Sequence, residues 1–506
     1  MKTPDVIVVG AGHNGLVAAN YLAKAGRSVL VLESRGEAGG QLVAAGTAPA
    51  WVTDPLHAGG QLRPDIVRDL GLASRGLVPT ATSPLLSALP GNGMLRISAD
   101  PGDAAAVESI KAHSARDAAR WPEFVAFMQA GAAFLDAALA TPMPRLSNEE
   151  LRREGWPLAR LGWKLRGLGK RDMFRFMRSL SMSAQELGEE WFESEAVRAA
   201  IGAVAIHGAT LGAMSAGTGY TLLHNWLNRG GCAPSAPAGG TRRIAEALVA
   251  ALASHGGTLR PGAPVARIRV ERQRVIGVTL ESGEEIAAGT VLSGADPRRT
   301  MLGLVGAPEL PPEYVWGLQS IRMRGSVAKV HVLTNGHHGL PEGTTVVAPS
   351  LRYLERAYDA SKYGEISQSP MLEVTTIGSA LSIHFQFASH TLRAGDWTRE
   401  RGTLERIALD TLGLRFPRLR DSVRELHTIT PLDLERDYGL TEGDLNHGQP
   451  ILDQLLFMRP LPGWSDHRTP VDGLYLCGSG THGGIGIGGG AGRNAARRVL
   501  AGPATG

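Results

Sequence analysis

The N-terminal end of the chain contains the sequence pattern that most restricts what it can fold into. Val6-Ile7-Val8-Val9 is an uninterrupted β-branched run, which is typical of a strand buried on both faces of a parallel sheet. It leads directly into Gly10-Ala11-Gly12-His13-Asn14-Gly15, a G-x-G-x-x-G, and a helical stretch follows. Residues 28–32 then predict a second strand, which ends at Glu33. Strand, glycine turn, helix, strand and acid in this order predict a dinucleotide-binding βαβ unit.

Each part of this pattern has a physical role. Gly10 permits the tight turn, Gly12 lets a pyrophosphate approach the backbone, and Gly15 lets the helix pack closely on the strand. The N-terminus of the helix presents free N–H groups and a partial positive charge to the phosphates. Glu33 lies where a carboxylate accepts hydrogen bonds from a ribose 2′-hydroxyl. The alternative interpretation is a glycine-rich turn that holds no ligand.

The residues after Glu33 bear on which dinucleotide binds, because an acid at that position fits NAD and the adenosine half of FAD equally well. Arg35, Gly39 and Gly40 extend the pattern to E-x-R-x-x-x-G-G, which resembles the flavoprotein form of the fingerprint. This resemblance implies FAD, with the glycine pair beside its pyrophosphate or flavin. Gln41 stands where flavoproteins often carry Arg or Lys, so a charged contact from that position is lost.

The C-terminal end carries a second glycine-rich segment, which we expect to close the same site. Residues 473–477 predict a short strand, and the glycines that follow lead into a helix that we expect to begin near Gly490. Residues 484–489 formally match a second G-x-G-x-x-G, but the strand ends seven residues too early for a second dinucleotide site. The segment instead predicts a wide loop on which a flat ring lies against backbone. The helix N-terminus would then face the flavin N1/O2 edge, where reduction builds negative charge.

The order of these motifs resembles the phytoene desaturase and carotenoid isomerase group of FAD-dependent oxidoreductases, in the branch that contains pyridine nucleotide-disulfide oxidoreductase domain-containing protein 2. Besides the two glycine-rich ends, the residues that carry the resemblance are Gly239-Gly240, Ser293-Gly294-Ala295-Asp296-Pro297, Leu432-Asp433-Leu434-Glu435, Asp453-Gln454-Leu455, Met458-Arg459-Pro460, Pro462-Gly463-Trp464 and Asn494-Ala495-Ala496. It covers nearly the whole chain and implies an FAD-dependent oxidoreductase. In two places the chain departs from the family: Ser479 replaces an acid that many relatives use for the ribityl chain of the flavin, and His482-Gly483-Gly484 replaces His-Pro-Gly-Gly.

The pattern and the resemblance together give one set of predicted cofactor-binding residues. Val265 enters this set through the resemblance alone, which implies that its backbone clamps the adenine. The set consists of Gly10, Gly12, His13, Asn14, Gly15, Glu33, Ser34, Arg35, Gly39, Gly40, Gln41, Val265, Gly294, Gly478, Ser479, Gly488 and Gly489.

Flavin chemistry asks little of the protein beyond placement of the substrate. A flavin accepts hydride at N5, so the protein must hold a C–H bond against the ring and exclude water. The sequence shows no strong catalytic dyad. His482, which follows the flavin loop directly, and His57 are the candidates for contact with flavin or substrate, although a single His is more often a satisfied polar residue. We predict no metal site and no covalent flavin link through Cys477.

The chain as a whole predicts an α/β fold. It comprises a Rossmann-type FAD-binding domain assembled from separated segments, a substrate domain built on a mixed β-sheet, and a helical cap. Residues 101–230 are mostly helical in pattern, including Ala115 to Ala140 and Ser194 to Leu223, whereas β-branched runs within 259–292 and 323–390 predict sheets. The expected boundaries are 1–75, 235–300 and 465–506 for the FAD segments, 100–230 for the cap and 301–460 for the substrate-binding domain.

Composition excludes several classes of function. The chain carries 52 Lys and Arg against 48 Asp and Glu, a poor balance for nucleic-acid binding, and no nucleic-acid-binding motif occurs. Cys232 and Cys477 are its only cysteines, which excludes a disulfide framework, a four-thiolate zinc site and a dithiol centre on one loop. No separate fingerprint for NAD(P)H occurs besides the N-terminal one, so a reductase that binds two nucleotides is excluded. Because no signal-peptide core and no run of ~18 uncharged apolar residues is present, we expect a cytoplasmic protein.

Residues 151–178 are the most basic part of the chain. They contain nine Arg and Lys against two acidic residues, interleaved with Trp, Phe, Met and Leu. This pattern suits peripheral contact with an anionic membrane. It also suits a helical cap whose apolar face packs on its own domain while Arg and Lys face water. Pro157 and the neighbouring glycines argue against one long helix.

Three functional hypotheses follow. The leading one is an FAD-dependent dehydrogenase, desaturase or oxidase that takes hydride from an apolar small molecule onto flavin N5. The resemblance to carotenoid isomerases gives a second, in which reduced flavin catalyses alkene isomerisation without net redox change. The third is a flavin-binding partner protein without turnover, and the intact flavin loops argue against it.

Overall fold

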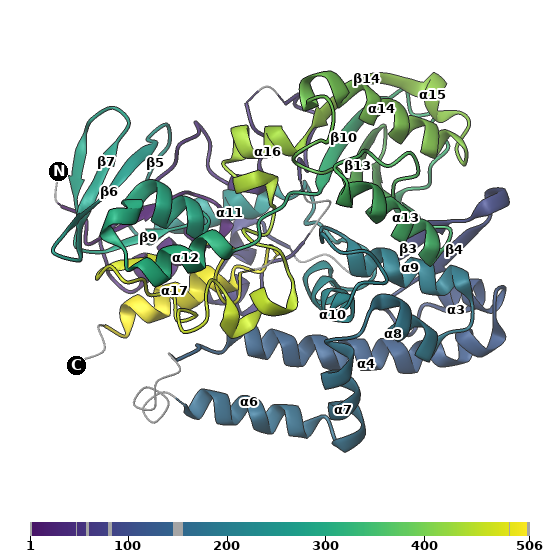
Figure 1. Ribbon diagram of the computed structural model, residues 1–506, viewed down its shortest axis with the longest axis horizontal. Helices are drawn as coiled ribbons and strands as arrows, with labels where there is room; N and C mark the ends of the chain where they lie inside the picture. Colours follow the sequence, from purple (N-terminus) through teal and green to yellow (C-terminus); the bar gives the residue numbers. More distant parts are fainter. Residues whose placement is uncertain are drawn as a thin grey trace.

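The computed structural model describes residues 3–46, 48–56, 60–78, 83–144, 155–484 and 486–502. Within these residues the chain forms three sheets with helices packed over them (Figure 1). In the view of Figure 1 a five-stranded sheet lies on the left, a seven-stranded sheet lies on the right, and a layer of helices runs along the lower margin.

The five-stranded sheet is parallel throughout, in the order β15-β9-β1-β2-β5. All four residues of β1 are buried, because helices cover one face of the sheet and a three-stranded sheet covers the other. The strands are β1 (Val6–Val9), β2 (Val29–Leu32), β5 (Thr258–Arg260), β9 (Val291–Ser293) and β15 (Leu474–Leu476). They come from three separated stretches of the chain, which confirms the predicted assembly of a Rossmann-type domain from separate segments.

Three helices pack on one face of this sheet through a shared apolar cluster. They are α1 (His13–Lys24), α11 (Arg242–Ser254) and α17 (Gly490–Leu500). The opposite face packs on an antiparallel sheet and on α12 (Pro312–Ser320). The strands of that antiparallel sheet are β6 (Val265–Glu271), β7 (Arg274–Leu280) and β8 (Glu285–Ala287).

The seven-stranded sheet is mixed, because β11 pairs in parallel with β3 and the other neighbours are antiparallel. In sheet order its strands are β14 (Val423–Ile429), β10 (Val327–Thr334), β13 (Ala380–Gln386), β12 (Leu372–Ile377), β11 (Gly343–Val347), β3 (Leu85–Ala88) and β4 (Met94–Ile97). One face packs on α14 (Trp397–Gly413). The hairpin of β3 and β4 lies before the expected substrate segment 301–460, so this sheet extends beyond it in sequence.

Most of the remaining helices form one region, whose core is rich in Trp and Phe. They are α3 (Ala104–Lys111), α4 (Ala115–Ala140), α6 (Trp156–Gly167), α7 (Lys170–Ser179), α8 (Ala184–Trp191), α9 (Glu195–Ile206) and α10 (Thr218–Arg229). The predicted helical stretch from Ser194 to Leu223 is two helices, because residues 207–217 interrupt it with Gly208, Gly212 and Gly217. Helix α13 (Leu351–Lys362) packs on α9 against the same core. Elsewhere lie α2 (Pro64–Asp69), α15 (Leu419–Ser422) and α16 (Pro431–Tyr438).

Helix α4 spans the predicted range and organises the helical region. Ser114 caps it by accepting a hydrogen bond from the Asp117 amide, and Trp121 and Phe124 are fully buried in the core. Among the described residues α4 is the one helix long and apolar enough to cross a membrane, and half of its apolar stretch is buried inside the protein. Its position in the middle of the helical layer is that of a core helix (Figure 1).

Candidate functional site

Three parallel strands end side by side, and a glycine follows each of them. Gly10 follows β1, Gly294 follows β9 and Gly478 lies two residues beyond β15. The Gly294 amide donates to the Val9 carbonyl over 2.8 Å, and a Cβ added to Gly478 would lie 2.5 Å from the Gly294 oxygen. The backbones therefore touch along one edge. Ligands of doubly wound sheets bind at this carboxyl edge, where the strand order reverses, which here is between β1 and β9.

The glycines at the start of α1 differ in what surrounds them. A Cβ added to Gly15 would lie 2.2 Å from the Gly10 carbonyl oxygen, so the helix is packed directly on the turn after β1. A Cβ added to Gly12 would meet no atom of the described chain within 4 Å. Gly12 is also the N-cap of α1, and no side chain caps the helix. Open space therefore lies in front of uncapped helix N–H groups, as a bound pyrophosphate requires.

Glu33 is held at the end of β2 by backbone contacts. Its carboxylate accepts hydrogen bonds from the Ala11 amide at 2.8 Å and from the Arg35 amide at 2.9 Å. The Ser34 hydroxyl also donates to it. The Ala263 amide donates to the Glu33 carbonyl over 2.8 Å, and β6 begins two residues later at Val265. The structure thus places Glu33, which is predicted to bind the ribose, close to Val265, which is predicted to clamp the adenine.

The glycine pair lies against the first glycine turn. The Gly39 amide donates to the Ala11 carbonyl at 2.9 Å, and a Cβ on Gly40 would lie 2.9 Å from the Gly12 Cα. The Arg35 guanidinium donates to the carbonyls of Gly40 and Val43, so it fixes the loop. Gln41 donates from Nε2 to the Leu445 carbonyl over 3.0 Å, which ties this loop to a segment of the substrate region.

His13 and Asn14, the variable residues of the G-x-G-x-x-G, join the two ends of the chain. The Asn14 amide donates to the Ser479 hydroxyl over 3.1 Å, and His13 Nε2 lies 3.1 Å from the Gly486 carbonyl. Burial lowers the pKa of His13 to about 4, so the ring is neutral. Gly489 is the uncapped N-cap of α17 in the left-handed region, and the neighbouring Gly488 carbonyl accepts from the Arg63 amide. The N-termini of α1 and α17 therefore belong to one site.

Arg459 supports the C-terminal loop from behind. Its guanidinium is buried and donates to the carbonyls of Ser479, Gln454 and Gly448 at 3.0–3.2 Å. Burial lowers the pKa of this group to about 10, although nearby Asp444 opposes that shift. Asp444 is itself buried, and burial raises its pKa to about 6. Arg459 belongs to the Met458-Arg459-Pro460 motif, but no local sequence pattern predicts that its guanidinium supports this loop.

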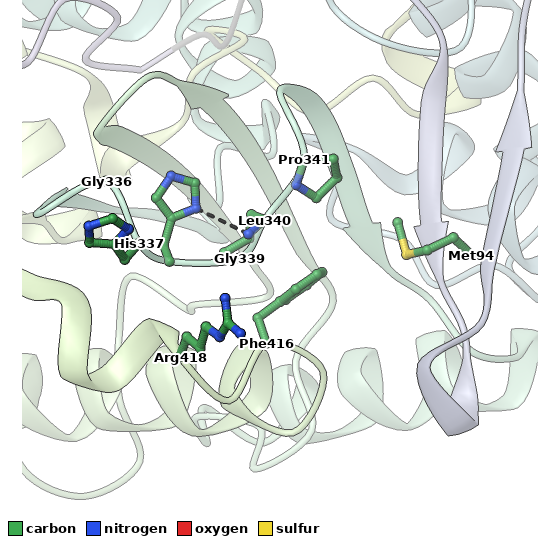
Figure 2. A pocket seen from close by; sticks show the side chains of 9 residues that line it. Met94, Gly336, His337, Gly339, Leu340, Pro341, Phe416 and Arg418 are labelled. Carbon is green, nitrogen blue, oxygen red and sulfur yellow. Dashed lines mark hydrogen bonds between the residues drawn. The ribbon is translucent and has the colours of Figure 1, made fainter.

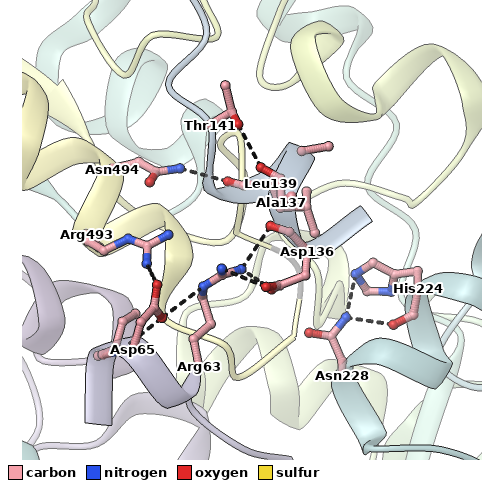
Figure 3. Close-up of polar contacts among 12 residues, drawn as sticks. Arg63, Asp65, Asp136, Ala137, Leu139, Thr141, His224, Asn228, Arg493 and Asn494 are labelled. Atoms are coloured by element: carbon pink, nitrogen blue, oxygen red, sulfur yellow. Dashed lines mark hydrogen bonds and ion pairs between the residues drawn. The ribbon is translucent and has the colours of Figure 1, made fainter. Parts of the chain in front are cut away.

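A chain of four charged residues links the FAD-binding helices to α4 (Figure 3). Arg63 forms a two-pronged ion pair with Asp136 near the end of α4 and also contacts Asp65. Arg493, in the first turn of α17, pairs with the other oxygen of Asp65. Burial alone would raise the pKa of Asp65, but the guanidinium groups of Arg493 and Arg63 outweigh burial and lower it. No sequence pattern predicts this network, because its members lie far apart along the chain.

Of the two catalytic candidates, His57 lies outside the described residues. His482 is fully buried, and its Nε2 lies 3.2 Å from the Ala138 carbonyl and 3.0 Å from the Thr141 carbonyl, at the end of α4. Asn494 of α17 donates to the neighbouring Leu139 carbonyl over 2.9 Å (Figure 3). These side chains satisfy carbonyls that a helix end leaves free. His482 therefore joins the flavin loop to α4, and its contact with flavin or substrate stays a prediction.

The seven-stranded sheet carries a row of charged and polar residues on the face opposite α14. Lys329, His384 and Glu373 pair across β10, β13 and β12, so their side chains lie in line on that face. Glu373 accepts from Arg229 of α10 over 2.6 Å. Lys329 is 1% exposed, and its Nζ has no hydrogen-bond partner in the described part of the chain. Burial lowers the pKa of Lys329 to about 8, against the opposing charges of Glu373 and Asp54.

This polar row faces the segment that follows the glycine pair. His331, two residues beyond Lys329, lies 3.0 Å through Nε2 from the Pro55 carbonyl, and burial lowers its pKa to about 3. The adjacent Asp54 accepts from the Thr241 amide at 2.7 Å, and Thr241 donates to the Leu42 carbonyl. The row therefore lies at the junction of the FAD-binding edge and the substrate sheet. A single Lys inside the strand-like run 327–333 is the sequence signal for this buried amine.

A cavity of about 510 Å³ lies elsewhere, at the opposite end of β10 (Figure 2). Its walls are the loop from Gly336 to Pro341 together with Phe416, Arg418 and Met94. The His338 ring accepts a hydrogen bond from the Leu340 amide there, which shapes the loop. None of the predicted cofactor residues lines this cavity, so we assign it no part in the flavin site.

Residues 15–386, more than half of the chain, match the model of the flavin containing amine oxidoreductase family. The chain belongs to this family. It is 32% identical to pyridine nucleotide-disulfide oxidoreductase domain-containing protein 2 of Rattus norvegicus, over 98% of this chain and 93% of the rat protein. The identity to a limonene dehydrogenase component of Castellaniella defragrans is 25%, over 99% and 95% of the two chains. The identity to the lycopene-forming phytoene desaturase of Pseudescherichia vulneris is 26%, over 95% of each.

A solved structure is similar over its full length. The oxidoreductase of Methanosarcina mazei superposes with a TM-score of 0.58 at 16% identity, over 98% of this chain and 99% of that one. At this identity the likeness concerns the fold alone. It confirms the predicted fold class.

The residues present at the carboxyl edge fit FAD. Gly12 leaves room for a pyrophosphate, the uncapped N-termini of α1 and α17 supply N–H groups, and Glu33 is held at the ribose position. Family membership and this fit agree with the sequence prediction of the cofactor. The protein is an FAD-dependent oxidoreductase.

Proposed function

We propose that the protein dehydrogenates an apolar small molecule, with hydride leaving one carbon and a proton leaving the neighbouring atom. FAD, when bound, supplies the hydride acceptor at its N5 atom. The two hydrogens leave with one electron pair, and the substrate gains a double bond. The chain's own residues must then bind the cofactor, exclude water and accept the proton.

Lys329 carries this proposal. Its Nζ is buried without a protein partner among the described residues, at the junction of the two sheets, and burial lowers its pKa to about 8. An amine in that state accepts a proton near neutral pH, which is the requirement for a general base. Once hydride has left a carbon, the adjacent C–H is acidic enough for an amine to remove its proton. We infer that Lys329 Nζ accepts that proton.

Two relatives support an apolar substrate. The names of the limonene dehydrogenase and of the phytoene desaturase each give a hydrocarbon substrate. The family name would favour an amine, but a substrate ammonium needs a carboxylate partner. Glu373, the carboxylate of the polar row, is already paired with Arg229. The row therefore favours a neutral substrate over a cationic amine.

The test is anaerobic reduction of the bound flavin by a panel of terpenes, linear polyenes and amines. We expect an apolar member of the panel to bleach the flavin and to lose two hydrogens by mass. Isomerisation would instead require prior reduction and leave the substrate mass unchanged. A flavin that stays oxidised with every compound would leave the binding-partner hypothesis standing and overturn the proposal.

The role of Lys329 is tested by the pH dependence of that bleaching. The neutral amine is the active form, so the bleaching rate should rise with pH and level off above about 8. Lys329→Met should slow bleaching by about 10²–10⁴-fold, the usual contribution of a general base, and flatten the profile. Lys362→Met is the matched control, because Lys362 is exposed and bound to Asp359. A Lys329→Met protein with full flavin content and the normal profile would remove Lys329 from the reaction.

A further inference from the structure

The helices α6 and α7 form the lower margin of the molecule, outside α4 (Figure 1). Pro157 lies in the first turn of α6, where a helix tolerates it, so the helix forms despite this residue. Gly169, with φ of +81°, separates the two helices. In residues 155–179, seven Arg and Lys stand against one acidic residue, Asp172. The pair of helices is therefore a strongly basic margin of the protein.

The two helices bury one stripe of apolar side chains and expose another. Leu165 of α6, Leu168 directly after that helix, and Phe176 of α7 pack on the core of the helical region. The outer face, defined here by Trp156, Arg160, Trp163, Arg166, Lys170, Phe174 and Met177, points away from that core. Its four large apolar side chains are 51–62% exposed: Trp156, Trp163, Phe174 and Met177. The core of the helical region is already covered by Leu165, Leu168 and Phe176. Covering that core therefore does not explain the four exposed side chains.

The basic residues of the two helices also fall into two groups. Arg171 pairs with Glu123 at 2.9 Å, Arg178 pairs with Glu190, and Arg175 lies 4.6 Å over the Trp191 ring. These three hold α7 on its neighbours. Within the described chain no ion pair engages the other four, which are Arg160, Lys164, Arg166 and Lys170. Unpaired cations therefore surround exposed indole and phenyl rings.

We propose that the outer face of α6 and α7 docks on an anionic membrane surface. Indole rings settle at the headgroup boundary, and unpaired cations beside them are attracted to anionic lipid. The face has both, and the Trp156 and Trp163 rings lie edge to face at 5.2 Å as one block. Docking would place the bilayer one helix from the flavin loop, because α6 packs on α4 and the end of α4 contacts His482. Notably, this proposal does not depend on the reaction proposed above.

The test uses full-length, flavin-loaded protein and sedimentation with phosphatidylcholine vesicles, with and without phosphatidylserine. We expect binding only with phosphatidylserine, and weaker binding at high salt. Arg160→Gln, Arg166→Gln and Lys170→Gln together should weaken binding about 100-fold, at about fivefold per cation. The matched control removes three exposed cations elsewhere through Arg267→Gln, Arg272→Gln and Arg274→Gln, and should change binding little.

A second pair of variants tests the apolar half of the face. Trp156→Ser with Trp163→Ser should weaken vesicle binding about tenfold or more, whereas Trp316→Ser, which removes a 73% exposed Trp from α12, should not. Absence of binding to phosphatidylserine vesicles at low salt would overturn the proposal. An equal loss of vesicle binding in the α6 double variant and in Trp316→Ser would also overturn it. So would self-association of the protein that depends on Trp156 and Trp163, because that outcome assigns the face to a second copy of the chain.

Discussion

Adding a side chain at Gly12 and at Gly15 should damage the protein in two different ways. At Gly15 the new Cβ would lie 2.2 Å from the Gly10 carbonyl oxygen, which belongs to the backbone of the turn after β1. At Gly12 the Cβ would meet no described atom within 4 Å, and φ of −68° is open to any residue. Gly15→Ala is therefore expected to be a folding defect, and Gly12→Val a cofactor defect.

The magnitudes follow from these contacts. The Gly15 contact is about 1 Å shorter than an ordinary van der Waals contact, so the helix must move, and overpacking of this kind costs about 3 kcal/mol. For a chain of 506 residues, that lowers Tm by roughly 3 °C. Gly12→Val loses a favourable N-cap residue, worth about 1 kcal/mol, but it also fills the space of the pyrophosphate. It should forfeit the stabilisation by bound FAD, about 4 kcal/mol at a thousandfold excess over Kd.

The assay measures flavin content by absorbance and Tm by circular dichroism, before and after FAD is stripped and added back. Wild-type protein should lose Tm on stripping and regain it with FAD. Gly12→Val should unfold slightly below stripped wild-type protein and ignore added FAD. Stripped Gly15→Ala should unfold below both of these and should regain part of its Tm when FAD is added. Full flavin content in Gly12→Val would show that the pyrophosphate binds elsewhere. A stripped Gly12→Val protein as unstable as Gly15→Ala would refute the separation of roles.

Two further predictions concern acid. Buried His13, His331 and His467 have folded-state pKa values lowered to about 3–4, so below pH 6.5 the unfolded chain takes up protons that the folded chain refuses. As the pH falls below 6.5, the free energy of unfolding measured with urea should therefore fall by about 1.4 kcal/mol per pH unit for each of these histidines. A His13→Gln protein whose stability depends on pH with the wild-type slope would contradict this. Acid precipitation should release the yellow flavin into the supernatant, because burial raises the pKa of the Cys477 thiol to about 12; colour retained on the polypeptide would refute non-covalent binding.

The strand, the glycine turn and the helix start of the FAD-binding unit could be predicted from sequence, because each depends on residues close to it in the chain. The buried run of β1 needs only apolar residues, and the turn after it needs a residue such as Gly10, whose φ is +91°. The start of α17 at Gly490 likewise follows from the preceding glycines. These are local properties of backbone and burial, so a short stretch of residues is sufficient to encode them.

Tertiary structure decided everything that depends on residues distant in the chain. Lys329 gains its lowered pKa only when β10, β12 and β13 pair and Arg229 closes over Glu373. The hairpin of β3 and β4 joins the substrate sheet only through β11. Sequence also left open which stripe of α6 is buried, since leucines and tryptophans both recur at helical spacing. Packing against α4 settled it, because the core accepts one face of a helix and leaves the other, with Trp156 and Trp163, outside.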